Sequence, residues 1–204
     1  MSSEPGLRER KKQRMYETLS ETAIRLFLEK GYDAVSVAEI AAVAEISKPT
    51  LFRYFPTKED LVFHRIADHE DEAARVVVGA PEVAPLVALR RDFLDGIERV
   101  DPITGLSDHP AVLAFYDLLY GTPALVARMY AHLERSEEAL AEALGGDLDA
   151  RLAAGQIVAV RRVLAQENWR RVTGGEDVGV VRADAVAAAE RAFDLLGAGL
   201  PHLA

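Results

Sequence analysis

Residues 35–61 read VSVAEIAAVAEISKPTLFRYFPTKEDL, and this stretch decides the fold of the N-terminal part of the chain. Ser36 followed by Glu39 is a capping box, which predicts the start of a short helix. Ser47 precedes Pro49, and a proline is favourable in the first turn of a helix because its missing N–H has no partner there. A second short helix is therefore predicted after a tight turn, and two such helices form a helix-turn-helix.

The segments on either side of this stretch also have helical periodicity. Apolar residues recur at helical spacing over residues 8–30, and Gly31 follows as a stop. Thr57 is a third N-cap, and a long fourth helix is predicted to run unbroken from Lys58 to about Val78. Further helices are expected at 84–100, 109–119, 122–144, 149–173 and 181–199, between connections that contain Pro or Gly. The sequence therefore predicts an all-α fold of about nine helices.

The run SKPTLFRYFPTKEDL, residues 47–61, closely resembles the DNA-binding region of the tetracycline-repressor (TetR-like) family of bacterial transcriptional regulators. The resemblance covers about 50 N-terminal residues, and the C-terminal part matches in length, helicity and the ending ERAFDLLGAGL. It implies a helix-turn-helix DNA-binding domain over residues 1–57, with a basic N-terminal arm over 1–14. It also implies a helical ligand-binding and dimerisation domain over residues 58–204.

A recognition helix presents polar groups to DNA from one side and is anchored to its scaffold by the other. Leu51 and Phe55 supply the anchoring side of the third helix. The family's pattern implies that Lys48, Thr50 and Arg53 contact base edges or nearby phosphates. The expected DNA-binding residues are Ser36, Ser47, Lys48, Thr50, Phe52, Arg53, Tyr54 and Lys58.

Two residues depart from the family's pattern. Glu45 stands in the turn where the family usually has glycine, and it places a negative charge near the DNA backbone. Phe52 stands where the family usually has tyrosine, so a hydroxyl expected to bind phosphate is missing. A flexible basic arm is expected to add minor-groove or phosphate contacts through Arg8, Arg10, Lys11, Lys12 and Arg14.

The distribution of charge supports an anionic partner at the N-terminal end. The chain has a net charge of −9, which by itself argues against binding to nucleic acid. Residues 1–60, however, carry ten Lys and Arg against ten Asp and Glu, whereas the rest of the chain carries 14 against 23. All five lysines lie in the first 58 residues. Chance together with a codon bias toward arginine is the alternative explanation.

Composition and motifs argue against several other classes of protein. The chain of 204 residues has no cysteine, which excludes thiolate nucleophiles and cysteine-ligated metals. No signal peptide or membrane-spanning run is present, so a soluble, cytoplasmic protein without a membrane partner is expected. The five histidines have no metal-ligand spacing, and no nucleotide or nucleophile motif occurs. We therefore predict no catalytic residue, no metal, no cofactor and no enzymatic activity.

The middle helices carry bulky residues that have two explanations. They form either an ordinary core or, as the resemblance implies, the wall of a cavity for a small-molecule effector. Since no buried cluster of Arg or Lys is evident, a mostly hydrophobic effector is expected. The predicted wall consists of Phe115, Leu119, Met129, Leu133, Asn168 and Trp169.

The last helix has an apolar arc that is wide enough for two partners. It is either a central core helix of a monomer or a helix that packs against both its own domain and a second subunit. The small-residue stripe predicted to form the dimer interface is Ala185, Ala188, Ala192, Leu195 and Gly199.

These features together predict a homodimeric, ligand-responsive transcriptional repressor. It would bind a pseudo-palindromic double-stranded DNA operator and be released by a small molecule that tilts the fourth helix. The alternative is a small-molecule carrier or protein-interaction module with a degenerate DNA-binding end.

Overall fold

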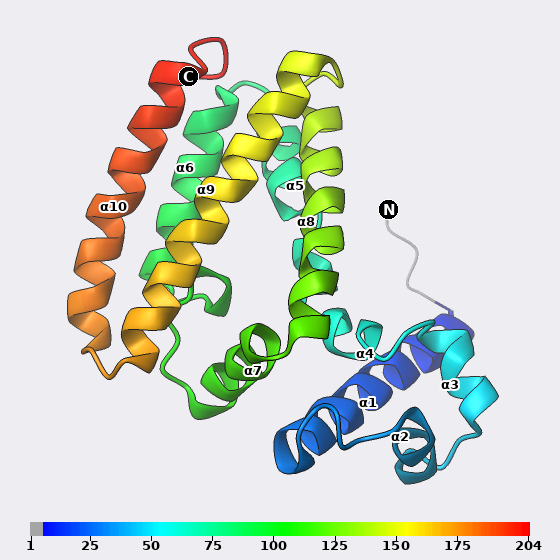
Figure 1. The fold of residues 1–204 in the computed structure, drawn as a ribbon. Helices are drawn as coiled ribbons and strands as arrows, with labels where there is room; N and C mark the ends of the chain where they lie inside the picture. The colour runs from blue at the N-terminus through cyan, green and yellow to red at the C-terminus, as the bar shows by residue number, and fades with distance from the viewer. Residues whose placement is uncertain (1–5) are drawn as a thin grey trace. The chain divides into compact units, whose positions relative to one another are not determined.

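The computed structural model describes residues 6–204, and its regular structure is entirely helical over that range (Figure 1). The described chain contains ten α-helices and two 3-10 helices. The segment predicted as a fourth helix is interrupted, as described below. If that segment is counted as one helix, the described chain has nine α-helices, and the predicted all-α fold is confirmed. The chain divides into two compact units, which we call unit 1 (residues 1–68 and 114–129) and unit 2 (residues 69–113 and 130–204). The functional boundary expected at residue 57 stays a prediction.

Unit 1 is built from the helix-turn-helix and the helices that cover it. Its core is formed by large apolar side chains that are almost fully buried, among them Leu19, Phe27, Ile40, Leu51 and Leu61. Adjoining parts of two later helices complete the unit. Its elements are α1 (Leu7–Lys30), α2 (Val37–Val43), α3 (Lys48–Tyr54), α4 (Asp60–Phe63) and parts of η1 (His64–His69), α7 (Pro110–Gly121) and α8 (Pro123–Ala143).

The predicted caps of the short helices are present. The Ser36 hydroxyl accepts a hydrogen bond from the backbone N–H of Glu39 at 3.1 Å, at the start of α2. The Ser47 hydroxyl accepts one from the N–H of Thr50 at 3.2 Å, at the start of α3. Each bond satisfies an N–H group that has no partner within the helix. The sequence thereby sets where both helices of the motif begin.

The prediction of an unbroken fourth helix is wrong. The chain forms α4, then the 3-10 helix η1, and then a separate helix α5 (Glu72–Gly79). Six of the eight residues in 64–71 are charged or histidine, so an α-helix there would have no continuous apolar face to bury. Short 3-10 segments are common connectors where the side chains of an α-helix lack such support.

The expected flexible arm is also corrected in part. Residues 1–5 lie outside the described residues, but residues 7–14 form the first two turns of α1. Arginine, lysine and glutamate are good helix formers, and no glycine or proline follows Gly6 before Gly31. The basic side chains of residues 8–14 therefore project from a helix.

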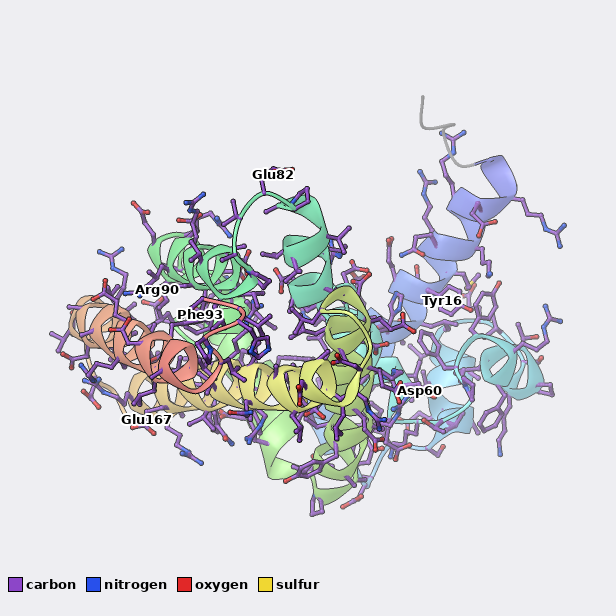
Figure 2. The ribbon with its side chains drawn as sticks, turned by 90° about the horizontal axis from the view of Figure 1, so that it is seen from above. Tyr16, Asp60, Glu82, Arg90, Phe93 and Glu167 are labelled. Carbon is purple, nitrogen blue, oxygen red and sulfur yellow. The ribbon has the colours of Figure 1, made fainter. Side chains whose placement is uncertain are left out.

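Unit 2 is a helical bundle in which α10 (Val178–Gly199) packs against α6 (Pro85–Glu98) and α9 (Leu148–Thr173) (Figure 1). Phe93 of α6, labelled in Figure 2, lies with its ring centroid 6.3 Å from that of Phe193. The 3-10 helix η2 (Pro102–Thr104) also packs against α9. Unit 2 is completed by α5 and by the adjoining parts of η1, α7 and α8.

The contact between η2 and α9 depends on a glycine. Gly105 has a φ of 77°, and a Cβ atom there would lie 2.0 Å from the carbonyl oxygen of Ala165. Only glycine allows so close an approach of two backbones. The side-chain amide of Asn168 donates a hydrogen bond to the Thr104 carbonyl at 2.9 Å and holds the same contact.

Over residues 6–204, no single helix is both long and apolar enough to cross a membrane, and α7 with α8, bent by 94°, meets the criteria of length and composition only as a pair.

Candidate nucleic-acid interface

The recognition helix α3 presents two different sides. Leu51 is fully buried and Phe55, its C-cap, is 3% exposed, so these two side chains anchor the helix in the core of unit 1. Lys48, Phe52 and Arg53 are exposed on the other side. The anchoring residues predicted from the sequence are confirmed, and the exposed side is the one that carries the predicted DNA contacts.

The turn before α3 adopts a conformation that usually requires glycine. Glu45 has a φ of 56°, in the left-handed region. The N–H of Ile46 donates to the Ala41 carbonyl at 2.9 Å and closes the turn. A glutamate in this conformation is strained by the contact of its Cβ with the backbone. The tight turn of the motif is therefore formed in spite of the residue at its centre.

A group of cations in unit 1 has no acidic partner among residues 6–204. Within the described part of the chain, no carboxylate oxygen lies within 4.0 Å of their nitrogens. The ammonium of Lys48 instead lies 5.7 Å from the ring centroid of Phe52. The Tyr16 ring, labelled in Figure 2, packs edge-on to Tyr54 with centroids 5.0 Å apart, so the first half of α1 and the end of α3 are in contact. The cations are Arg8, Arg10, Lys11, Lys12, Arg14, Lys48 and Arg53.

Lys58 is held differently from the other predicted DNA contacts. Its ammonium donates a hydrogen bond to the backbone carbonyl of Tyr32. The same ammonium lies 3.9 Å from the centroid of the Tyr32 ring and 5.1 Å from the centroid of the Phe27 ring. Partial burial lowers the pKa of the Lys58 ammonium. Tyr32 in turn donates from its hydroxyl to Glu59 at 2.6 Å. Lys58 therefore has a structural role within unit 1, whether or not it also contacts phosphate.

The hydroxyl residues of the predicted site serve the helix starts. Ser36 and Ser47 are the N-caps described above, and the hydroxyls of Ser47 and Thr50 lie 2.8 Å apart. Tyr54 is half-buried against Tyr16. These residues lie in one helix-turn-helix, and their contacts with DNA stay predictions.

This geometry is that of a known family of regulators. The family described as "Bacterial regulatory proteins, tetR family" matches residues 19–64. The transcriptional regulator TcmR of Streptomyces glaucescens is 34% identical over 179 residues, which cover 82% of this chain and 78% of TcmR. The chain belongs to the TetR family. It is a DNA-binding transcriptional regulator and not an enzyme, as predicted.

Two solved structures of repressors share the fold at low sequence identity. NalD, the secondary repressor of the MexAB-OprM multidrug efflux pump in Pseudomonas aeruginosa, has a TM-score of 0.58 and 18% identity, covering 88% of this chain and 97% of NalD. FadR of Thermus thermophilus, solved with lauroyl-CoA, has a TM-score of 0.52 and 22% identity, covering 89% of this chain and 92% of FadR. These likenesses show the same fold over 88–89% of this chain.

The residues predicted to line an effector pocket fall in both units. Phe115, Leu119 and Met129 belong to the apolar core of unit 1 or pack against it. Leu133 packs against the core of unit 2, where Asn168 is bound to η2. Trp169 also lies in unit 2, so the pocket that would join these residues stays a prediction.

One residue of the predicted dimer stripe of α10 belongs to the buried row of that helix. Ala185 is 3% exposed in the core of its own unit, which corrects its assignment to the dimer stripe. The physical reason is helical periodicity, because residues 181, 185, 189 and 193 form one buried row at four-residue spacing. Ala188 and Ala192 are half-buried, and Leu195 and Gly199 are exposed.

Sequence reasoning missed a charged cluster inside unit 2. Arg161 of α9 is only 14% exposed, and its Nη2 lies 3.0 Å from Oδ2 of Asp92 on α6. The Nη1 atom of Arg161 is buried without a hydrogen-bond acceptor among the described residues. Asp92 stands directly before the buried Phe93, and Arg161 four residues after the buried Ile157. A charged residue within an apolar face is the signal that could have revealed this pair.

Proposed function

We propose that this TetR-family regulator binds a pseudo-palindromic operator as a homodimer, represses transcription there, and is released by a small molecule. The observation that carries the DNA part is the group of seven cations on α1 and α3 that have no acidic partner within residues 6–204. Phosphate groups would supply those partners, and release of their counterions would make binding steeply dependent on salt. Arg53, exposed on α3, is proposed to contact base edges, together with Lys48 and Thr50.

The test is selection of bound sequences from random DNA duplexes, followed by titration of the recovered operator and a scrambled duplex. We expect operator binding in the roughly nanomolar range and at least about a thousandfold weaker binding to the scrambled duplex. A pseudo-palindrome with half-sites about one helical turn apart would agree with two helix-turn-helix motifs. Equal affinity for both duplexes would refute sequence-specific recognition.

The dimer proposal is supported by an exposed apolar face on the last two helices. Five large apolar side chains of α9 and α10 are each more than half exposed, although the two helices pack together. Large exposed apolar side chains on two helices that pack together are typical of a protein interface. The five residues are Leu148, Leu152, Val163, Val180 and Leu195.

The dimer is tested by placing a charge on this face. Leu195 is 75% exposed, so Leu195→Arg should leave the fold intact and yet separate the subunits, because the arginine would be buried unpaired in the interface. Val78→Arg is the matched control, since Val78 is 68% exposed on α5. Analytical ultracentrifugation should show a dimer for the wild type and Val78→Arg and a monomer for Leu195→Arg. A monomeric wild type at micromolar concentration would contradict the proposal.

The proposal of a small-molecule effector rests on the middle helices and is tested by filling the predicted pocket. Operator release is measured across a panel of hydrophobic and polar compounds to find one that acts on the wild type. Leu133→Trp should keep operator binding and no longer respond to that compound. Unit 2 does bury one arginine, Arg161, which is 14% exposed, so the panel includes polar compounds. Release of Leu133→Trp with unchanged dose dependence would place the effector elsewhere.

A further inference from the structure

Phe52 is the exception among the phenylalanines of this chain. Six of the seven phenylalanines are at most 4% exposed and lie in the apolar core of one unit or the other. Phe52 is 40% exposed, on the solvent side of α3. Single exposed apolar side chains are common on protein surfaces, so exposure alone assigns Phe52 no role. The arrangement of its neighbours on α3 is more informative.

The exposed side of α3 is apolar at its centre and cationic at both margins. At about 100° per residue, Phe52 and Pro49 lie between Lys48 and Arg53 around the helix axis. All four side chains are exposed. We call Phe52 and Pro49 the apolar strip. The surface that α3 presents is therefore an apolar strip with a cation on each side.

The ring of Phe52 contacts a cation and carries no polar group of its own. The Lys48 ammonium, one helical turn away, lies over the ring at 5.7 Å from its centroid. Phenylalanine has no hydroxyl, so the ring cannot make the hydrogen bond to phosphate that a tyrosine would make. The nearby hydroxyls of Ser47 and Thr50 already bond to one another at 2.8 Å. The centre of the exposed side therefore offers mainly apolar contact.

The floor of the DNA major groove has one apolar group that fits such a strip. Every base pair presents hydrogen-bonding atoms there, and among the four standard bases only thymine also presents a methyl group, on C5. Contact between Phe52 and this methyl group removes apolar surface from water, whereas contact with a phosphate would desolvate a charge without giving it a partner. The cations at the margins can reach phosphates or polar base edges on either side. The chemistry of α3 therefore matches a thymine at the centre of its contact with DNA.

We propose that Phe52, together with Pro49, reads the C5-methyl group of a thymine in each half-site of the operator. This inference rests on the proposed function and adds to it the base that the centre of α3 prefers. Phe52 is then a specificity-determining residue, because a cytosine at the same position lacks the methyl group. Burial of one such group corresponds to about a fourfold change in affinity, and burial in two half-sites to about fifteenfold.

The test uses the full-length protein and the operator recovered by selection. Each thymine is replaced in turn, in both half-sites at once, by deoxyuridine, which forms the same base pair and lacks only the methyl group. We expect at least one thymine position per half-site at which this replacement weakens binding by about fifteenfold. Exchange of T·A for C·G at that position should also weaken binding, and 5-methylcytosine there should bind more tightly than cytosine by about the same factor.

Variants of Phe52 assign the effect to its ring. In Phe52→Ala, operator binding should weaken, and deoxyuridine should then change the affinity by less than about twofold. Phe52→Leu keeps an apolar side chain and should keep part of the dependence on the methyl group. Leu28→Ala is the matched control, since Leu28 is 43% exposed on α1, and it should keep the full dependence. Removal of the methyl group also alters the duplex itself, but equally for every variant, so the difference between variants isolates the contact.

The outcomes separate this inference from the proposed function. If no duplex is bound specifically, both fail. If an operator is bound specifically but no thymine in it responds to deoxyuridine, the proposed function stands and the reading of a methyl group by Phe52 is overturned. A response of the same size in the wild type and in Phe52→Ala also overturns it, since another residue then contacts the methyl group. A response that is lost in Phe52→Ala and kept in Leu28→Ala supports it.

Discussion

On α3 of unit 1, Lys48 and Arg53 face solvent with no acidic partner among the described residues. In unit 2, by contrast, Arg90, Arg161 and Arg171 each have a carboxylate oxygen within 3.0 Å. A cation already paired with an acid of its own chain must give up that bond to hold a phosphate. The comparison teaches that the exposed cations of the proposed recognition helix are available to phosphate, whereas these three arginines of unit 2 already serve the fold.

The largest expected effect comes from breaking a pair inside unit 2. Asp92→Ala should lower the free energy of unfolding by about 3 kcal/mol, because it leaves the largely buried Arg161 without its acid. Burial raises the pKa of the Asp92 carboxyl in spite of the nearby arginine, so the desolvation cost of this pair is considerable. Urea denaturation measures the loss.

Two matched variants sharpen this prediction. Asp194→Ala removes the 68% exposed partner of Arg90 and should cost no more than about 0.5 kcal/mol. Replacing Asp92 and Arg161 together by leucine and methionine should recover most of the loss. If Asp92→Ala lowers the free energy of unfolding by no more than Asp194→Ala does, the pair of Asp92 and Arg161 is no more structural than a surface pair.

The next effect concerns the unpaired cations of α3. Arg53→Ala should weaken operator binding by about 1–3 kcal/mol and relax the preference at particular base pairs, while the free energy of unfolding stays the same. The same titration over a range of salt concentrations should give a smaller slope for Lys48→Ala, if Lys48 binds a phosphate. A loss of stability in either variant would contradict the view that these cations are unused within the protein.

Lys58 shares features with both the unpaired cations of α3 and the paired cations of unit 2, and replacing it should affect both stability and DNA binding. Lys58→Ala removes a hydrogen bond to the Tyr32 carbonyl and contacts with two aromatic rings, so unfolding should become easier by about 1–2 kcal/mol. Binding should weaken alike for operator and scrambled duplex, if Lys58 also meets a phosphate. Thermal denaturation and the paired titrations separate the two roles. Unchanged stability would return Lys58 to the class of unpaired cations.

Local signals were sufficient for most of the fold. Ser36 and Ser47 mark the helix starts of the motif because capping depends on residues three apart in the chain. The interruption after Phe63 is harder to predict, since neither glycine nor proline occurs in residues 64–71. Its local signal is the run of charged residues and histidines, which leaves no continuous apolar face. His64 also stacks on Tyr16 with centroids 5.4 Å apart, and a contact between residues so far apart in the chain leaves no local pattern.

The charged residues of the protein also divide into those that could be predicted from the sequence and those that could not. Exposed residues of α3 could be predicted because the family's pattern and the helical repeat both place them on one side. The paired residues could not, because Arg128 finds Asp60 across 68 positions and Arg161 finds Asp92 across 69. Charge alone does not distinguish an arginine that faces DNA from one that faces a carboxylate. Only the folded chain does so.

The smallest expected effect concerns strain in the turn of the DNA-binding motif. Unit 2 also has a residue other than glycine in the left-handed region, Val100 with a φ of 53° after α6, but its side chain packs against the core. Glu45 is exposed and has no such compensation.

Glu45→Gly should therefore raise the free energy of unfolding by about 0.5–1 kcal/mol, since relief of the left-handed strain exceeds the extra entropy of glycine in the unfolded chain. Val100→Gly should bring no gain, because the lost packing offsets the relief. Operator affinity should rise modestly in Glu45→Gly, as a negative charge leaves the neighbourhood of the phosphates. Glu45→Gln separates the two causes, because it removes the charge and keeps the strain. Its affinity should match that of Glu45→Gly while its stability stays at the wild-type value, and equal stability of all three proteins would show that the turn is not strained.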